Sequence, residues 1–207
     1  TKVINDDDLI IKMKKIILAS TSPRRHNLLQ QIGLKFEIVP SKYEEDMTLK
    51  LPPHELAMVL ARGKAFEVAE RKKSGIVIGV DTFVVFGKTV IGKPHNKVNA
   101  KKTLEKISNK TLKVYSGIAI IDAKTKKEII DYEISKVKIR KISPLEIKKY
   151  IATEEPLDKA GAFGMQGLGA IFVAKIDGCY SNVVGLPLHN LTKNLKKMGI
   201  DVFSYRE

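Results

Sequence analysis

Residues 17–26 read ILASTSPRRH, which is an apolar run followed by three small hydroxyl residues, a proline and two arginines. The apolar run predicts a short buried strand over residues 14–19. A serine suits the N-cap of a helix, a proline suits its first turn and a glycine suits its end, so we expect a helix over residues 23–32. The stretch therefore predicts a strand that leads directly into a helix N-terminus.

The two cations in the first turn of that helix need an explanation, because a helix N-terminus carries partial positive charge. Without an anion, Arg24 and Arg25 should each cost about 0.3–1 kcal/mol there. Free backbone N–H groups, the hydroxyls of Ser20 and Ser22 and the guanidinium groups together suit a chain of phosphates. The alternative is that both arginines extend into solvent or pair with acidic groups elsewhere. The stretch lacks the glycines and lysine of a Walker loop.

The composition indicates one folded domain that needs no disulfides. The chain has 207 residues, of which 43% are hydrophobic, and no apolar run approaches the ~20 residues of a membrane helix. A single cysteine, Cys179, excludes a disulfide framework and a zinc cluster built on cysteine, and it fits a cytoplasmic location. Residues 1–12 lack the pattern of a secretion signal, and we expect an extension there before a domain over residues 13–207.

The net charge of +14 raises nucleic acid as a partner. Only 6 of the 37 basic residues are arginine, the lysines are spread over the whole chain, and there is no tryptophan or RNA-recognition signature. Scattered lysines are typical of a solvated surface, so a nucleic-acid partner is not expected. The basic field would still attract a polyanionic small molecule.

Strands and helices mix in the remaining sequence without strict alternation. Strands are expected over residues 36–39, 76–80, 83–86, 90–91, 113–121, 128–141 and 170–176, and helices over residues 54–73, 99–107, 144–152 and 187–199. The long helix is expected to bury Leu56, Val59, Leu60, Ala65, Phe66 and Ala69. This pattern predicts an α/β (α+β) fold with a mixed sheet, and two lobes separated by a cleft.

Further polar groups that a phosphate site needs occur in four places. The loop YEED at residues 43–46 could hold Mg²⁺ against phosphate oxygens, or it could be a solvated acidic loop. Asp81 follows an apolar run and could bind a metal or take a proton from water, or it could be an ordinary turn residue. Lys93 lies between a glycine and a proline that fix its backbone. Lys64, on the long helix, reads as a surface residue when taken alone.

The stretch 155–169, EPLDKAGAFGMQGLG, predicts a packed glycine-rich loop. Its glycines would allow the backbone to approach a ligand closely. Phe163, Met165 and Leu168 argue against a flexible linker. Gln166 could read the edge of a base, because its amide offers both a donor and an acceptor.

Five motifs in this order resemble the Maf family of nucleoside triphosphate pyrophosphatases. They are SxSPRR at residues 20–25, GxDT at 79–82, GKP at 92–94, the glycine-rich loop at 155–169 and NVVGLPL at 182–188. The resemblance implies an elongated mixed α/β fold with a central cleft, similar to that of the inosine triphosphate pyrophosphatases, and often a homodimer. It also implies cleavage of a triphosphate between the α and β phosphates with a divalent metal, Mg²⁺ or else Mn²⁺ or Co²⁺.

The resemblance also implies roles for individual residues. Ser20, Ser22, Arg24 and Arg25 would bind phosphates, Glu45 and Asp81 would hold the metal and the attacking water with Asp81 as base, Lys64 and Lys93 would contact the triphosphate, and Gln166, Asp158 and Lys159 would lie near the base. The run DKAGAFGMQG resembles the branch that acts on dTTP, UTP and related modified pyrimidine triphosphates. The alternative is a regulator linked to septation that binds a nucleotide or nucleic acid without turnover.

Overall fold

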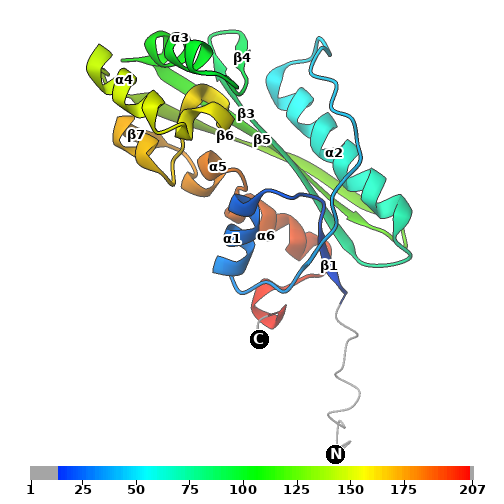
Figure 1. Cartoon of the computed structure of the whole chain (residues 1–207). Helices are drawn as coiled ribbons and strands as arrows, with labels where there is room; N and C mark the ends of the chain where they lie inside the picture. The colour runs from blue at the N-terminus through cyan, green and yellow to red at the C-terminus, as the bar shows by residue number, and fades with distance from the viewer. Residues whose placement is uncertain (1–13, 206–207) are drawn as a thin grey trace, which may run out of the picture.

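One mixed sheet runs through the computed structural model, which describes residues 14–205 (Figure 1). The elements are, in chain order, β1 (Ile16–Leu18), α1 (Pro23–Gln31), β2 (Glu37–Ile38), α2 (Pro53–Arg71), β3 (Ile76–Phe86), β4 (Thr89–Ile91), α3 (Lys97–Ile107), β5 (Thr111–Asp122), β6 (Glu128–Ile139), α4 (Pro144–Ala152), the 3₁₀ helices η2 (Glu155–Asp158), η3 (Ala160–Ala162) and η4 (Leu168–Phe172), β7 (Val173–Asp177), α5 (Tyr180–Val184), α6 (Leu188–Lys197) and η5 (Val202–Tyr205). The expected extension over residues 1–12 lies outside the described residues.

The sheet has seven strands, in the order β2-β1-β3-β5-β6-β7, with β4 paired to β3. β1 is parallel to both β2 and β3, and all other pairs are antiparallel. The mixed α/β class expected from the sequence is therefore confirmed. No helix within residues 14–205 is both long enough and apolar enough to cross a bilayer.

The strand β3 is longer than the sequence indicated. It runs without a break through Asp81, so the expectation that an apolar strand ends at Asp81 is wrong. Ten consecutive residues of β3 pair with β5, and Asp81 lies opposite Gly117 in that ladder. The paired backbone keeps the strand continuous across one polar side chain, because buried N–H and C=O groups need partners.

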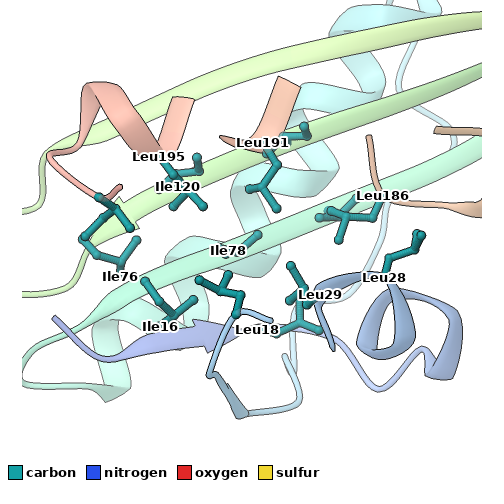
Figure 2. Close-up of a cluster of buried hydrophobic side chains, with 14 of the residues drawn as sticks. Ile16, Leu18, Leu28, Leu29, Ile76, Ile78, Ile120, Leu186, Leu191 and Leu195 are labelled. Atoms are coloured by element: carbon teal, nitrogen blue, oxygen red, sulfur yellow. The ribbon is translucent and has the colours of Figure 1, made fainter. Parts of the chain in front are cut away.

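One face of the sheet carries two separate cores. Ile78 and Val80 of β3 pack with α1 and α6 in the first core, of which Figure 2 shows labelled side chains. Val84 of β3 and Val114 of β5 pack with α3 and α4 in the second. The two helix groups lie at opposite ends of this face (Figure 1), so a stretch of sheet between them is left as a floor.

Among the helices of residues 14–205, only α2 covers the opposite face (Figure 1). The helix contacts the sheet through an alanine stripe at i, i+4 spacing, namely Ala57, Ala61, Ala65 and Ala69, all fully buried. A Cβ atom added at Gly79 of β3 would lie 2.3 Å from the Ala61 carbonyl oxygen, and one at Gly117 of β5 would lie 2.0 Å from the Ala57 carbonyl oxygen. Small residues on both sides therefore bring the helix backbone directly onto the sheet.

This stripe corrects the expected face of the long helix. Leu56, Leu60, Ala65 and Ala69 are buried, but Val59 is 38% exposed and Phe66 is 41% exposed. The apolar pattern predicted that large side chains face the sheet. The helix lies too close to the sheet for them, so alanines occupy the contact instead.

Local turn and cap signals were more reliable. β3 and β4 form the expected tight hairpin, and the capping box that opens α4 is present, with Ser143 Oγ accepting from the Glu146 amide and the Glu146 carboxylate accepting from the Ser143 amide. The helix α5 was missed, because five residues are too few for a periodic signal. The predicted glycine-rich loop contains three short 3₁₀ helices. The last of them runs to Phe172, so the strand expected from residue 170 begins only at Val173.

We predict that Gly117→Ala destabilises the fold. The new methyl group overlaps the backbone of α2 at Ala57 and must push the helix away from the sheet. The free energy of unfolding should fall by about 1–3 kcal/mol, the usual cost of overpacking. Urea denaturation measures this change.

Thr111→Ala, at the exposed start of the same strand, is the matched control and should change the unfolding free energy by less than about 0.5 kcal/mol. A Gly117→Ala variant as stable as the wild-type protein would contradict the close helix–sheet contact.

Candidate active site

A cleft of about 610 Å³ opens on the sheet face between the two cores. Thr82, Val84 and Val114 form part of its floor. The first turn of α1 forms one wall, the glycine-rich loop forms another, and residues 183–185 contribute a third. The cleft between two lobes that the sequence predicts therefore lies above β3 and β5.

Five of the predicted binding and catalytic residues line this cleft: Ser22, Arg24, Arg25, Lys159 and Gln166. Ser22 occupies the predicted N-cap position of α1, but its side chain makes no capping hydrogen bond. Arg24 is half-buried, and its guanidinium group makes no hydrogen bond or ion pair with any group in residues 14–205. The wall at α1 thus presents a helix N-terminus, a hydroxyl and a cation to one cavity.

Arg25 is already bonded within the protein. Its Nε donates to the Gly185 carbonyl oxygen at 3.0 Å, its Nη1 donates to Ser20 Oγ at 3.0 Å, and its Nη2 contacts Thr82 Oγ1 at 3.5 Å. Burial lowers the pKa of Arg25, and the charge of Asp81 opposes that shift. Arg25 therefore ties α1 to β3 and to the segment after α5, and Ser20, outside the cleft walls, supports Arg25.

A second group of predicted residues forms an ion-pair triad at β3. Lys64 Nζ lies 2.7 Å from Glu45 Oε1 and 2.5 Å from Asp81 Oδ1. The side chains of Lys64 and Asp81 are only 12% and 8% exposed, whereas that of Glu45 is 44% exposed. The interpretation of Lys64 as a surface residue is wrong, because its ammonium group compensates the buried carboxylate of Asp81.

The triad and the cleft meet at the edge of β3. Successive side chains of a strand point to opposite faces, so Asp81 faces α2 and Thr82 faces the cleft. β1 pairs with β3 only at residues 76–78 and β4 only at residues 84–86, so within the described chain no strand covers this edge between them. The residues that follow β1 lead from this gap into α1.

The triad offers a limited set of metal ligands. No group of three or more His, Cys, Asp or Glu side chains suited to a metal occurs among residues 14–205. Glu45 and Asp81 are two carboxylates that share one ammonium group. Mg²⁺ is commonly held by one or two carboxylates together with substrate phosphates and water, and these two residues fit that arrangement only when a substrate completes it.

Two further predicted residues, Lys93 and Asp158, belong neither to the cleft walls nor to the triad. Lys93 is exposed and does not line the cleft, although the Gly92 carbonyl oxygen accepts from the Gly161 amide of the glycine-rich loop at 3.3 Å. Asp158 is 72% exposed and pairs with its neighbour Lys159, which does line the cleft.

Glu155 holds the glycine-rich loop together, a role that the sequence did not reveal. Its carboxylate accepts from Tyr150 Oη at 2.9 Å and from the amides of Leu168 and Gly169 at 2.8 and 3.0 Å. Burial raises the pKa of Glu155, but these hydrogen bonds together hold it below its usual value. A Cβ atom at Gly167 would lie 2.6 Å from this carboxylate, so at this position glycine makes room for a protein group.

The packing of this loop was only partly predicted. Phe163 is buried and Met165 is half-buried, as expected, but Leu168 is 54% exposed. Gln166 is exposed at the cleft wall.

The segment before Glu45 is anchored by Glu67 of α2. The Glu67 carboxylate accepts from Ser41 Oγ at 3.1 Å, from the Lys42 amide at 2.9 Å and from Arg71 Nε at 2.6 Å. The hydrogen bond from Arg71 is the main reason why the pKa of Glu67 falls from 4.5 to about 2.

The chain is similar to several known proteins. A family model described as Maf-like protein matches residues 15–198. A protein of Caldicellulosiruptor saccharolyticus named dTTP/UTP pyrophosphatase is 47% identical over 92% of this chain and 98% of its own length. A Bacillus cereus protein of the same name is 48% identical over 92% of this chain and 93% of its own length. A solved HAM1 protein from Coxiella burnetii aligns with a TM-score of 0.40 at 16% identity, over 61% of this chain and 73% of that one.

We predict that Glu67→Gln flattens the acid limb of the stability curve. A folded-state pKa below the ordinary value means that the carboxylate stabilises the folded protein above pH 4.5, and that this contribution disappears as the pH falls towards 2. The difference in unfolding free energy between wild type and variant should be largest at neutral pH and should shrink between pH 4.5 and about 2. Urea unfolding across this range measures it, and parallel curves for the two proteins would contradict the assignment.

Proposed function

This chain belongs to the Maf-like protein family, and on that premise we propose that it is a nucleoside triphosphate pyrophosphatase acting on dTTP and UTP. Relatives at 47–48% identity over 92% of the chain carry the name dTTP/UTP pyrophosphatase, which supports both the hydrolase activity and the pyrimidine substrates. The reaction yields a nucleoside monophosphate and pyrophosphate, and related modified pyrimidine triphosphates are further substrates in this proposal.

The observation that carries the proposal is the meeting of two charged groups at the edge of β3. A cationic helix N-terminus lines the cleft on one face, and the triad of Glu45, Lys64 and Asp81 lies on the other. A triphosphate carries about four negative charges, and positioned cations and N–H groups supply most of the stabilisation in phosphoryl transfer.

Phosphates would contact donor groups at this edge that have no hydrogen-bond partner within the described chain. Ser22 and Arg24 offer donors in the cleft wall without side-chain hydrogen bonds of their own in the described chain. Arg25 holds that wall in place and contributes its charge, with Ser20 supporting it. The ammonium group of Lys64 can exchange its carboxylate partners for a phosphate oxygen. Lys93 would have to turn towards the cleft to contact the triphosphate.

Asp81 is the base in this proposal. It lies at the stretch of β3 that neither β1 nor β4 pairs, and a carboxylate there would accept the proton of the water that attacks the α-phosphorus. Glu45 and Asp81 would hold a divalent metal, Mg²⁺ or else Mn²⁺ or Co²⁺, jointly with the phosphates. Such a metal supplies charge neutralisation on the departing pyrophosphate.

The base of the nucleotide would lie at the glycine-rich loop. Thymine and uracil present one N–H donor beside carbonyl acceptors, and the amide of Gln166 offers the complementary acceptor and donor. Lys159 lines the same wall, and Asp158 orients Lys159 through their ion pair. This arrangement supports a pyrimidine preference.

The remaining parts of the proposal rest on the family resemblance and the composition. They are a single domain over residues 13–207, a homodimer and a cytoplasmic location, the last supported by a lone free cysteine, Cys179.

The activity is tested by incubating the protein with dTTP and Mg²⁺ or Mn²⁺ and identifying the product. Release of pyrophosphate with dTMP supports the proposal. Orthophosphate would indicate a phosphatase, and binding without turnover would indicate the regulator that the sequence left open.

We predict that Asp81→Asn lowers turnover by about 10²–10⁴-fold, the usual contribution of a general base. The amide has nearly the same shape but cannot accept the proton. Pyrophosphate release under saturating dTTP measures the loss, and circular dichroism checks the fold.

Asp177→Asn, in a carboxylate 66% exposed on the edge strand β7, is the matched control and should retain wild-type turnover. Wild-type activity in Asp81→Asn would rule out Asp81 as the base.

A further inference from the structure

The segment that carries Glu45 runs along α2 and is fastened to it at successive turns. Arg71 Nη2 donates to the Pro40 carbonyl oxygen at 2.8 Å, and one turn earlier Glu67 accepts from the Lys42 amide at 2.9 Å. A further turn towards the start of the helix, the segment contacts Gly63. Contacts at positions 71, 67 and 63 follow the i, i+4 spacing of one helix face.

At this last contact the ring of Tyr43 lies directly over Gly63. A Cβ atom added at Gly63 would lie 2.3 Å from Tyr43 Cζ and 2.5 and 2.6 Å from the two adjoining ring carbons. The half-buried ring also packs against the core formed by Leu56, Ala57, Leu60, Phe83, Val85 and Tyr115. Glycine is among the least favourable residues for a helix interior, so its presence here is explained by the ring that occupies the space of a side chain.

Glu45 and its partner Lys64 lie next to this contact in the sequence. The Glu45 side chain is 44% exposed, and its carboxylate pairs with Lys64 Nζ at 2.7 Å. Only one residue separates Glu45 from Tyr43, and Lys64 directly follows Gly63 in α2. The Tyr43–Gly63 contact therefore lies beside both partners of the Glu45–Lys64 ion pair.

We propose that Tyr43 and Gly63 are positioning residues that act on catalysis through Glu45. This inference rests on the proposed function, because it assigns to Glu45 a share in the reaction at Asp81. Neither Tyr43 nor Gly63 lines the cleft, so they should affect the chemical step more than the binding of the nucleotide.

The decisive variant is Gly63→Ala. The methyl group displaces the Tyr43 ring and with it the Glu45 carboxylate, so kcat for dTTP should fall by about 10²-fold, the cost of a misplacement near 1 Å, while KM changes by less than about threefold. In a Glu45→Ala background the same substitution should have almost no further effect, because the group on which it acts is gone.

A double-mutant cycle provides the second measurement. Tyr43→Val removes the ring that positions Glu45, so it should itself lower kcat. Because the methyl group introduced at position 63 then has no ring to displace, the double variant Tyr43→Val/Gly63→Ala should have the kcat of Tyr43→Val within about twofold. Val59→Ala, an exposed change one turn earlier on α2, should leave kcat unchanged. If Gly63→Ala does not fold, the double variant against Tyr43→Val alone tests the same coupling, and it should retain at least the kcat of Tyr43→Val.

Three results would overturn the inference: wild-type kcat in Gly63→Ala, the same fold loss in kcat from Gly63→Ala in the wild-type and Glu45→Ala backgrounds, or the same fold loss from Gly63→Ala in the wild-type and Tyr43→Val backgrounds. A crystal structure of Gly63→Ala separates this inference from the proposed function. If the wild type releases no pyrophosphate, the function is wrong, and the positional claim still predicts that Glu45 and Lys64 have moved beyond ion-pair distance. An unchanged ion pair in that structure would refute it.

Discussion

The close contact between α2 and the sheet is the constraint from which the site follows. Alanines on the helix meet Gly79 and Gly117 on β3 and β5, and no Cβ fits between the backbones at these points. At that separation Lys64, on the same helix, reaches Asp81 on β3 at 2.5 Å. A larger residue at either glycine would lift the helix, and the buried carboxylate would lose its compensating ammonium group.

Arg24 and Arg25 have different roles because their surroundings differ. Arg25 donates to the carbonyl oxygen of Gly185 and to Ser20 and thereby holds the helix N-terminus against β3. Arg24 lines the cleft, and its side chain makes no hydrogen bond within the described chain. Both cations are unfavourable at a helix N-terminus. For Arg25 this cost is offset by hydrogen-bond acceptors within the protein. For Arg24, in the proposed function, it is offset by the phosphates of the substrate.

Local signals in the sequence predicted the elements well, because caps, tight turns and apolar runs act over a few residues. The hairpin after β3 and the capping box of α4 are examples. Long-range contacts were harder to predict. The burial of Lys64 depends on a partner 17 residues away, and the part played by Glu155 depends on amides 13 and 14 residues away in the same loop. The spacing of residues in the sequence predicts neither contact. Most of the predicted site residues came from the resemblance to a family.

The most direct test of this account is a crystal structure with a dTTP analogue whose α–β bridge cannot be hydrolysed. The account predicts phosphates at the unpaired edge of β3, contacted by Arg24 and Lys64, with Asp81 facing the α-phosphorus and the thymine at Gln166. Phosphates bound away from β3, with Lys64 still enclosed between Glu45 and Asp81 and Arg24 turned to solvent, would contradict it.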